Sequence, residues 1–235
     1  MKSLTTILFA FLFITGINTA FADSQVRSIT GFNGVTLSCS ADVYITQGNT
    51  ESVRVEAPSN VINRIKTEVK DGVLNIYSKG DWDWNLGDLF GGHKKIAVYI
   101  SAKQLNSLTV SGSGDMSFKD GITTNSLRLR VSGSGDMTGR LQTKDLECTV
   151  TGSGDMKLSG RAETSAVRIS GSGDFSGRDL VTSITRVHIT GSGDATVNAN
   201  NTVDASVTGS GDIRYTGSAK NVSSSATGSG SVHKI

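Results

Sequence analysis

The chain of 235 residues lacks a strong net charge, a basic block and, after residue 22, any long apolar run. Its 23 lysines and arginines nearly balance 21 aspartates and glutamates, which argues against nucleic-acid binding and against an electrostatic membrane anchor. No segment after residue 22 is apolar over a length that could span a membrane. The second half also lacks helical spacing of apolar residues, which excludes strands joined by crossover helices there.

Cysteine and histidine are scarce, and neither predicts a reactive site. Cys39 and Cys148 lie far apart in the sequence, so we expect two buried free thiols rather than a disulfide, although an oxidising compartment would permit one. His93, His188 and His233 are scattered and form no arrangement of nucleophile, base and acid. The sequence therefore predicts no catalytic residue and no cofactor.

Residues 1–22 have the pattern of a secretory signal peptide. Lys2 precedes an apolar stretch from Ile7 to Ile17, and Ala20-Phe21-Ala22 matches a cleavage site with small residues. The mature chain would begin at Asp23, with no lipobox cysteine after it. We expect an exported protein, located in the periplasm or at the cell surface.

One short phrase recurs throughout the second half of the chain. The copies are Gly112–Asp115, Gly133–Asp136, Gly152–Asp155, Gly171–Asp174, Gly191–Asp194, Gly209–Asp212 and a degenerate Gly228–Ser231. A period near 20 residues is typical of a solenoid, in which each repeat buries its apolar face against its neighbours. We therefore expect residues 108–235 to form a regular solenoid, continuous with a less regular part at 23–107.

Apolar residues around each copy alternate with polar ones, which predicts strands. Before the phrase, positions such as Val131, Val150 and Ile169 repeat as one inward column, and Leu129, Cys148 and Val167 repeat as a second. Met137, Met156 and Phe175 begin a third inward column directly after the aspartate. Period-two alternation without helices predicts an all-β fold, a parallel β-helix with rungs of about 19–20 residues.

The Gly-Ser-Gly-Asp phrase has two interpretations. It could be a turn that needs a positive φ at glycine. Alternatively, both glycines are small inward residues of an extended segment. An earlier relative of the phrase, Leu37–Val43, has Cys39 and Ala41 at the glycine positions, and both residues disfavour a positive φ. The sequence therefore favours the extended, inward interpretation.

The same alternation places a row of serines and aspartates on the outside. Its centre is the candidate ligand-binding site and consists of Ser134, Asp136, Ser153, Asp155, Ser172 and Asp174. A column of carboxylates must face solvent, bind cations, or accept hydrogen bonds from serine hydroxyls and backbone N–H groups. A purely structural alternative is that each aspartate caps the backbone of its own repeat.

The first half contains a predicted hairpin and an inserted loop. Thr67–Tyr77 is expected to turn at Asp71-Gly72. The loop at 80–92 contains Trp82 and Trp84, which could stack on sugar rings or only cover the flank of the solenoid. Weak candidates for a calcium site in this loop are Asp81, Asp83 and Asn85. The late glycine and the missing glutamate disfavour that site, so no metal is predicted.

These motifs together resemble a known family. Gly31–Leu37, Asp42–Gly48, Thr67–Tyr77 and the Gly-Ser-Gly-Asp array are similar to the autotransporter adhesin head domain, or GIN domain, of secreted Bacteroidetes-type proteins. The resemblance covers roughly Val26–Ile235. It implies a right-handed parallel β-helix loosely similar to pectin lyases, without established catalytic residues, and a role in adhesion.

The predicted function is therefore non-enzymatic adhesion, or binding of a cell-surface glycan or other polymer, through the repeated serine and aspartate face. One alternative is a polysaccharide-acting enzyme on a pectin-lyase-like fold, which rests on fold analogy alone. Another is a structural or calcium-stabilised envelope scaffold. The open ends of a solenoid would also allow oligomers to form.

Overall fold

The computed structural model describes residues 22–79 and 95–235. Two expectations fall outside this part of the chain. One is the signal peptide at 1–22, of which only Ala22 is described. The other is the inserted loop at 80–92, with Trp82, Trp84 and the weak calcium candidates Asp81, Asp83 and Asn85.

The described residues form strands and turns, with no helix among them. The strands of the N-terminal part are β1 (Ala22–Arg27), β2 (Gly34–Leu37), β3 (Asp42–Gln47), β4 (Ser52–Pro58), β5 (Ile65–Lys70), β6 (Val73–Ser78), β7 (Ala97–Ala102) and β8 (Ser107–Val110). The strands of the regular part are β9 (Met116–Thr123), β10 (Ser126–Gly133), β11 (Met137–Gly152), β12 (Met156–Gly171), β13 (Phe175–Gly191), β14 (Ala195–Gly209), β15 (Ile213–Thr216), β16 (Asn221–Gly228) and β17 (Val232–Lys234).

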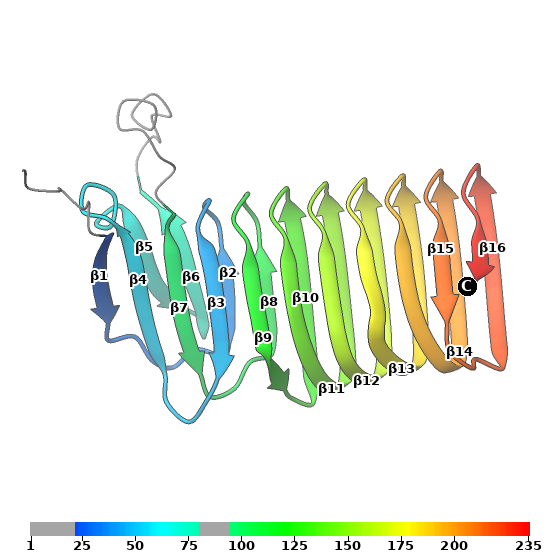
Figure 1. The fold of residues 1–235 in the computed structure, drawn as a ribbon, viewed down its shortest axis with the longest axis horizontal. Coiled ribbons are helices and arrows are strands. Elements are labelled where there is room, and N and C mark those ends of the chain that lie inside the picture. Colours follow the sequence, from blue (N-terminus) through cyan, green and yellow to red (C-terminus); the bar gives the residue numbers. More distant parts are fainter. Residues whose placement is uncertain (1–21, 80–94) are drawn as a thin grey trace, which may run out of the picture.

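Each repeat makes one turn of a parallel β-solenoid, here called a rung, and the rungs follow one another along the long axis (Figure 1). Val131 pairs with Val150, Val150 with Ile169, and Ile169 with Ile189, so equivalent residues lie directly above one another. This register repeats the same side chain at each level of the core. The predicted all-β solenoid, with a less regular N-terminal part, is confirmed.

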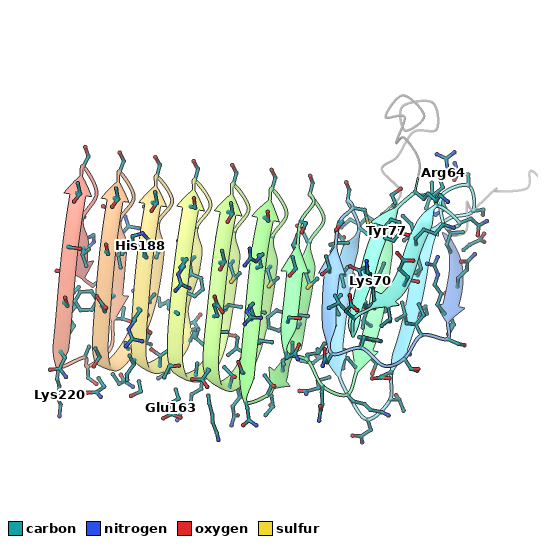
Figure 2. The ribbon with its side chains drawn as sticks, turned by 180° about the vertical axis from the view of Figure 1, so that it is seen from behind. Arg64, Lys70, Tyr77, Glu163, His188 and Lys220 are labelled. Carbon is teal, nitrogen blue, oxygen red and sulfur yellow. The ribbon has the colours of Figure 1, made fainter. Side chains whose placement is uncertain are left out.

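Each long strand bends and contributes to two stacks of parallel strands. Met137–Gln142 of β11 pairs with β9, whereas Asp145–Gly152 pairs with β10. We call the stack after each aspartate the first sheet and the stack before each glycine the second sheet. The two sheets meet at the Gly-Ser-Gly-Asp turns, which form the turn edge, and at the opposite bend, where Glu163 is labelled in Figure 2.

Inward-facing side chains from both sheets form one hydrophobic core. The predicted columns are buried: Val131, Val150 and Ile169 in the second sheet, and Met137 and Met156 in the first, are at most 1% exposed. Thr149 and Arg168, which alternate with them, face outward. Alternation with period two therefore assigns each side chain to the core or to the surface.

The N-terminal part departs from the parallel pattern. β1 and β7 both pair antiparallel with β4, and β5 pairs antiparallel with β6. The predicted hairpin at Asp71-Gly72 is confirmed: both residues have a positive φ, 52° and 75°, as a two-residue hairpin turn requires. Arg27 connects the two sheets at this end, because its guanidinium donates to Thr67 Oγ1 and to the carbonyl of Ile62.

At the other end, β16 and β17 each pair with one strand, β14 and β15 respectively. Ser224 and Ala226 continue the two inward columns of the second sheet, but both are exposed. Val222 is 43% exposed for the same reason, since no further rung covers β16 in this structure. Small and polar residues in these columns suit a strand that is open on one side.

The extended interpretation of the Gly-Ser-Gly-Asp phrase is wrong for the first glycine. Gly133, Gly152, Gly171, Gly191, Gly209 and Gly228 have φ between 111° and 143°, in the region that favours glycine. The second glycine, such as Gly154, is buried as expected. The prediction relied on Cys39, which occupies the position of the first glycine in an earlier rung. Gly112, which lies against Cys39, has no positive φ, so this pair does not represent the later turns.

We expect Ile169→Ala to lower the free energy of unfolding by about 2–5 kcal/mol, because it leaves a cavity between two stacked side chains. Arg168→Ala is the matched control, since this neighbouring side chain is 60% exposed and should contribute within about 0.5 kcal/mol. Denaturant melts of both variants measure the difference. Equal effects would contradict the assignment of the inward face.

A second comparison separates backbone strain from close packing at the turn edge. Gly31 has a positive φ and no neighbour within 4 Å of an added Cβ, so Gly31→Ala should cost about 1 kcal/mol of strain. At Gly152 the added Cβ would also meet the carbonyl of Gly133, so Gly152→Ala should destabilise the protein clearly more. Thermal melts of the two variants provide the measurement, and a Gly152→Ala effect no larger than that of Gly31→Ala would remove the packing constraint.

Candidate functional site

The turn edge brings together the serines and aspartates that the sequence singles out. In each of the six turns that follow Gly112–Asp115, the N–H groups of the serine and the second glycine both donate to the carbonyl of the first glycine in the preceding rung. Ser153 and Gly154, for example, bond the carbonyl of Gly133 at 3.0 Å. The turns therefore stack in the same register as the strands, and Figure 1 shows them as a row of similar loops.

The aspartates of the turns form a hydrogen-bonded ladder. In each of six rungs, the aspartate Oδ1 accepts the backbone N–H of the equivalent residue in the following rung at 2.8–3.0 Å. The bonded pairs are Asp115–Asp136, Asp136–Asp155, Asp155–Asp174, Asp174–Asp194, Asp194–Asp212 and Asp212–Ser231. We call the six acids the aspartate ladder. Each carboxylate stabilises the backbone of the next rung, and not of its own rung as one sequence interpretation had it.

The ladder also fixes what the turn edge presents to solvent. Ser134, Ser153 and Ser172 are exposed, and so are the aspartates that follow them by two residues. Because Oδ1 of each aspartate accepts a backbone hydrogen bond, the second carboxylate oxygen can interact with another molecule. The six predicted site residues therefore lie in one row, at the spacing of parallel strands, about 4.8 Å.

The C-terminal end of the ladder has a different electrostatic environment. Arg214 donates to Asp194 at 2.9 Å and to Asp212 at 3.2 Å. Asp212 also accepts hydrogen bonds from the hydroxyl and N–H of Ser231, and these bonds, with Arg214 nearby, hold its pKa below the usual value. Among the ion pairs of the described residues, none involves Asp136, Asp155 or Asp174.

Other candidate reactive groups are separated from one another. Cys39 and Cys148 are free thiols, as predicted, but only Cys148 is fully buried and Cys39 is half-buried. Burial raises the pKa of both thiols. His188 lies on the outer face of the second sheet beside Thr190 (Figure 2), and His233 lies near Ser231. In residues 22–79 and 95–235, no group of three or more His, Cys, Asp or Glu side chains is placed to hold a metal ion.

Sequence reasoning missed an aromatic cluster on the outer face of the first sheet. Tyr44 and Tyr99 stack with ring centroids 5.2 Å apart and an interplanar angle of 19°. The guanidinium of Arg54 lies 4.3 Å from the centroid of Tyr99. The signal was present as the repeated tripeptide Val-Tyr-Ile at 43–45 and 98–100. The pairing of β3 with β7, however, joins segments about 50 residues apart and could not be found from either tripeptide alone.

We expect Asp155→Ala to lower the free energy of unfolding by about 1 kcal/mol, because the N–H of Asp174 loses its acceptor. Asp155→Asn should cost little or nothing, since its amide oxygen can still accept and the repulsion between neighbouring carboxylates falls. Asp204→Ala, an exposed acid on the second sheet, is the control and should be nearly neutral. Denaturant melts that gave the same result for Asp155→Ala and Asp204→Ala would contradict the structural role of the ladder.

No helix of the described residues is long and apolar enough to cross a membrane.

Comparison with solved structures supports the solenoid fold. A putative adhesin from Bacteroides fragilis NCTC 9343 is 27% identical, with a TM-score of 0.84 over 91% of this chain and 96% of that one. A putative adhesin from Parabacteroides distasonis ATCC 8503 is 26% identical, with a TM-score of 0.72 over 92% and 98%.

A putative lipid binding protein from Parabacteroides distasonis ATCC 8503 is 24% identical, with a TM-score of 0.71 over 92% of this chain and 98% of that chain. At this identity the likeness shows the fold alone. Among curated proteins, none is similar enough to count as a match. The family model described as "Putative auto-transporter adhesin, head GIN domain" matches residues 31–219. Because this match spans most of the chain, the protein belongs to the GIN-domain family of putative adhesins.

Proposed function

We propose that this protein is an exported, non-enzymatic adhesin that binds a glycan or another linear polymer along its turn edge. Membership of a family of putative adhesins supports the adhesive role. The pattern of residues 1–22 supports export. The observation that carries the proposal is the aspartate ladder, because it holds identical polar groups at a fixed spacing along the molecule.

The ladder suits a polymer better than a compact ligand. Ser134, Ser153 and Ser172 repeat with the period of the rungs, and so do the outer oxygens of Asp136, Asp155 and Asp174. Hydroxyls and carboxylates can hydrogen-bond the hydroxyl groups of sugars. Each contact is weak, but contacts made by one linear molecule at several rungs add up through effective concentration.

Electrostatics permits this use of the aspartates. Two carboxylates about 5 Å apart in water repel by on the order of 0.8 kcal/mol, and salt reduces this further. The hydrogen bond to each Oδ1 offsets part of that repulsion. The centre of the row therefore keeps exposed charge without a balancing cation from the described residues.

A triple variant tests the proposal. Asp136→Asn, Asp155→Asn and Asp174→Asn together remove three charges while keeping an acceptor oxygen at each position. We expect binding of the mature protein to a glycan array, or to bacterial cells, to fall severalfold, while the melting temperature holds or rises from relieved repulsion. Measurements with and without calcium separate direct contacts from contacts made through a cation.

The matched control changes Asp145, Asp179 and Asp204 to Asn, which removes the same charge away from the turn edge. This control should bind as the unchanged protein does. Loss of binding together with loss of stability in the turn-edge variant would favour a structural scaffold. Unchanged binding and unchanged stability in that variant would remove the turn edge as the binding surface.

A further inference from the structure

Two stacked tyrosines and an arginine lie on the outer face of the first sheet, on β3, β7 and β4. In register order, Arg54 of β4 lies opposite Tyr99 of β7, and Tyr99 lies opposite Tyr44 of β3. Tyr99 is therefore covered by the guanidinium on one ring face and by Tyr44 on the other. Tyr44 is covered only on the side of Tyr99, and it remains 41% exposed.

The residues beyond Tyr44 leave its second ring face open. Its partner in β9 is Ser117, followed by Thr138 in β11 and Lys157 in β12. Ser117 and Thr138 are small, and both carry hydroxyl groups on the outer face of the sheet. Together they form a polar surface about 10 Å wide beside the open face of the Tyr44 ring, since adjacent strands lie about 4.8 Å apart.

Two arginines lie beside this polar surface. Arg140 is two residues beyond Thr138 on the same face, and Arg161 is paired with Gln142 in the next rung. Both line a surface hollow of about 340 Å³ together with Asp120, whose carboxylate accepts a hydrogen bond from Thr46. Neither arginine makes an ion pair among residues 22–79 and 95–235. The hollow therefore offers two free guanidinium groups.

The hollow arises where the repeat is irregular. The interval between Gly112 and Gly133 is 21 residues, and the register shifts so that Lys119–Gly121 lie opposite Arg140 alone. This bulge begins two residues after Ser117, the partner of Tyr44 in β9. The outer face of the first sheet therefore carries the ring of Tyr44, the hydroxyl groups of Ser117 and Thr138, and, beside them, the hollow with Arg140 and Arg161.

We propose that this surface binds an acidic oligosaccharide: one sugar ring stacks on the open face of Tyr44 above Ser117 and Thr138, and a sugar carboxylate pairs with Arg140 and Arg161. Aromatic rings contact the C–H face of pyranose rings, and guanidinium groups bind carboxylates in bidentate geometry. The site adjoins the turn edge, because Ser117 and Thr138 follow Asp115 and Asp136 by two residues, but it uses other side chains, on the outer face of the first sheet. It therefore goes beyond the proposed function and does not depend on it.

Titration calorimetry of the mature protein with a galacturonate hexamer tests the proposal, with a neutral glucose hexamer as the comparison ligand. We expect the acidic hexamer to bind and the neutral one to bind about tenfold or more weakly. Tyr44→Ala should weaken binding of the acidic hexamer about tenfold, and Tyr44→Phe, which keeps the ring, should leave it within about twofold. Melting curves show whether Tyr44→Ala remains folded, and the arginine variants provide an independent readout if it does not.

Arg140→Gln with Arg161→Gln should weaken binding about tenfold and abolish most of its dependence on salt. The matched control is Arg130→Gln with Arg168→Gln, which removes two arginines from the opposite sheet and should change nothing. Equal losses in the two double variants, equal binding of the two hexamers, or full binding by folded Tyr44→Ala would each overturn the proposal. Replacing the three aspartates of the turn edge should not weaken this binding, so the two surfaces are tested separately.

Discussion

The close approach of successive backbones at the turn edge is the constraint on which the rest of the structure depends. A Cβ on the second glycine of each turn would collide with the carbonyl of the equivalent glycine in the preceding rung, as at Gly154 and Gly135. The first glycine adds a positive φ, which turns the chain from the second sheet into the next rung. Because both glycines are fixed, the strands on either side are held in one register, and every core column follows from that register.

Translational symmetry decides where distinctive chemistry can occur. Within the regular rungs each outward position repeats, so the turn edge gives a periodic surface of serines and aspartates. Groups of different chemistry also come together where the repeat is broken. The bulge at Lys119–Gly121 and the junction of β3 with β7 are two such places, and they adjoin each other through Thr46 and Asp120. The periodic surface and the irregular one therefore suit different kinds of contact.

The core and the rung period could be predicted from the sequence because both depend on local alternation and exact recurrence. Val131, Val150 and Ile169 fall in one buried column for that reason. The backbone of the first glycine could not be predicted, since Cys39 occupies an equivalent position in a rung with different dihedral angles. The hydrogen-bond partner of each aspartate could not be predicted either. The same repeated residues are compatible with a bond to the following rung and with a bond within one rung. The stack of Tyr44 and Tyr99 depends on the pairing of β3 with β7, which no local sequence pattern specifies.

The direction of the aspartate ladder has a consequence for the size of the molecule. Every carboxylate bonds forward to the next rung, and every rung supplies the same donor and acceptor to its neighbours. Within the aspartate ladder, an internal rung can therefore be deleted or duplicated without leaving an unmatched donor or acceptor at the new junction. Ser231 donates its N–H and its hydroxyl to Asp212 and has no carboxylate of its own, so the ladder ends at this residue. The length of the solenoid can therefore change by one strand spacing for each repeat that is duplicated or deleted.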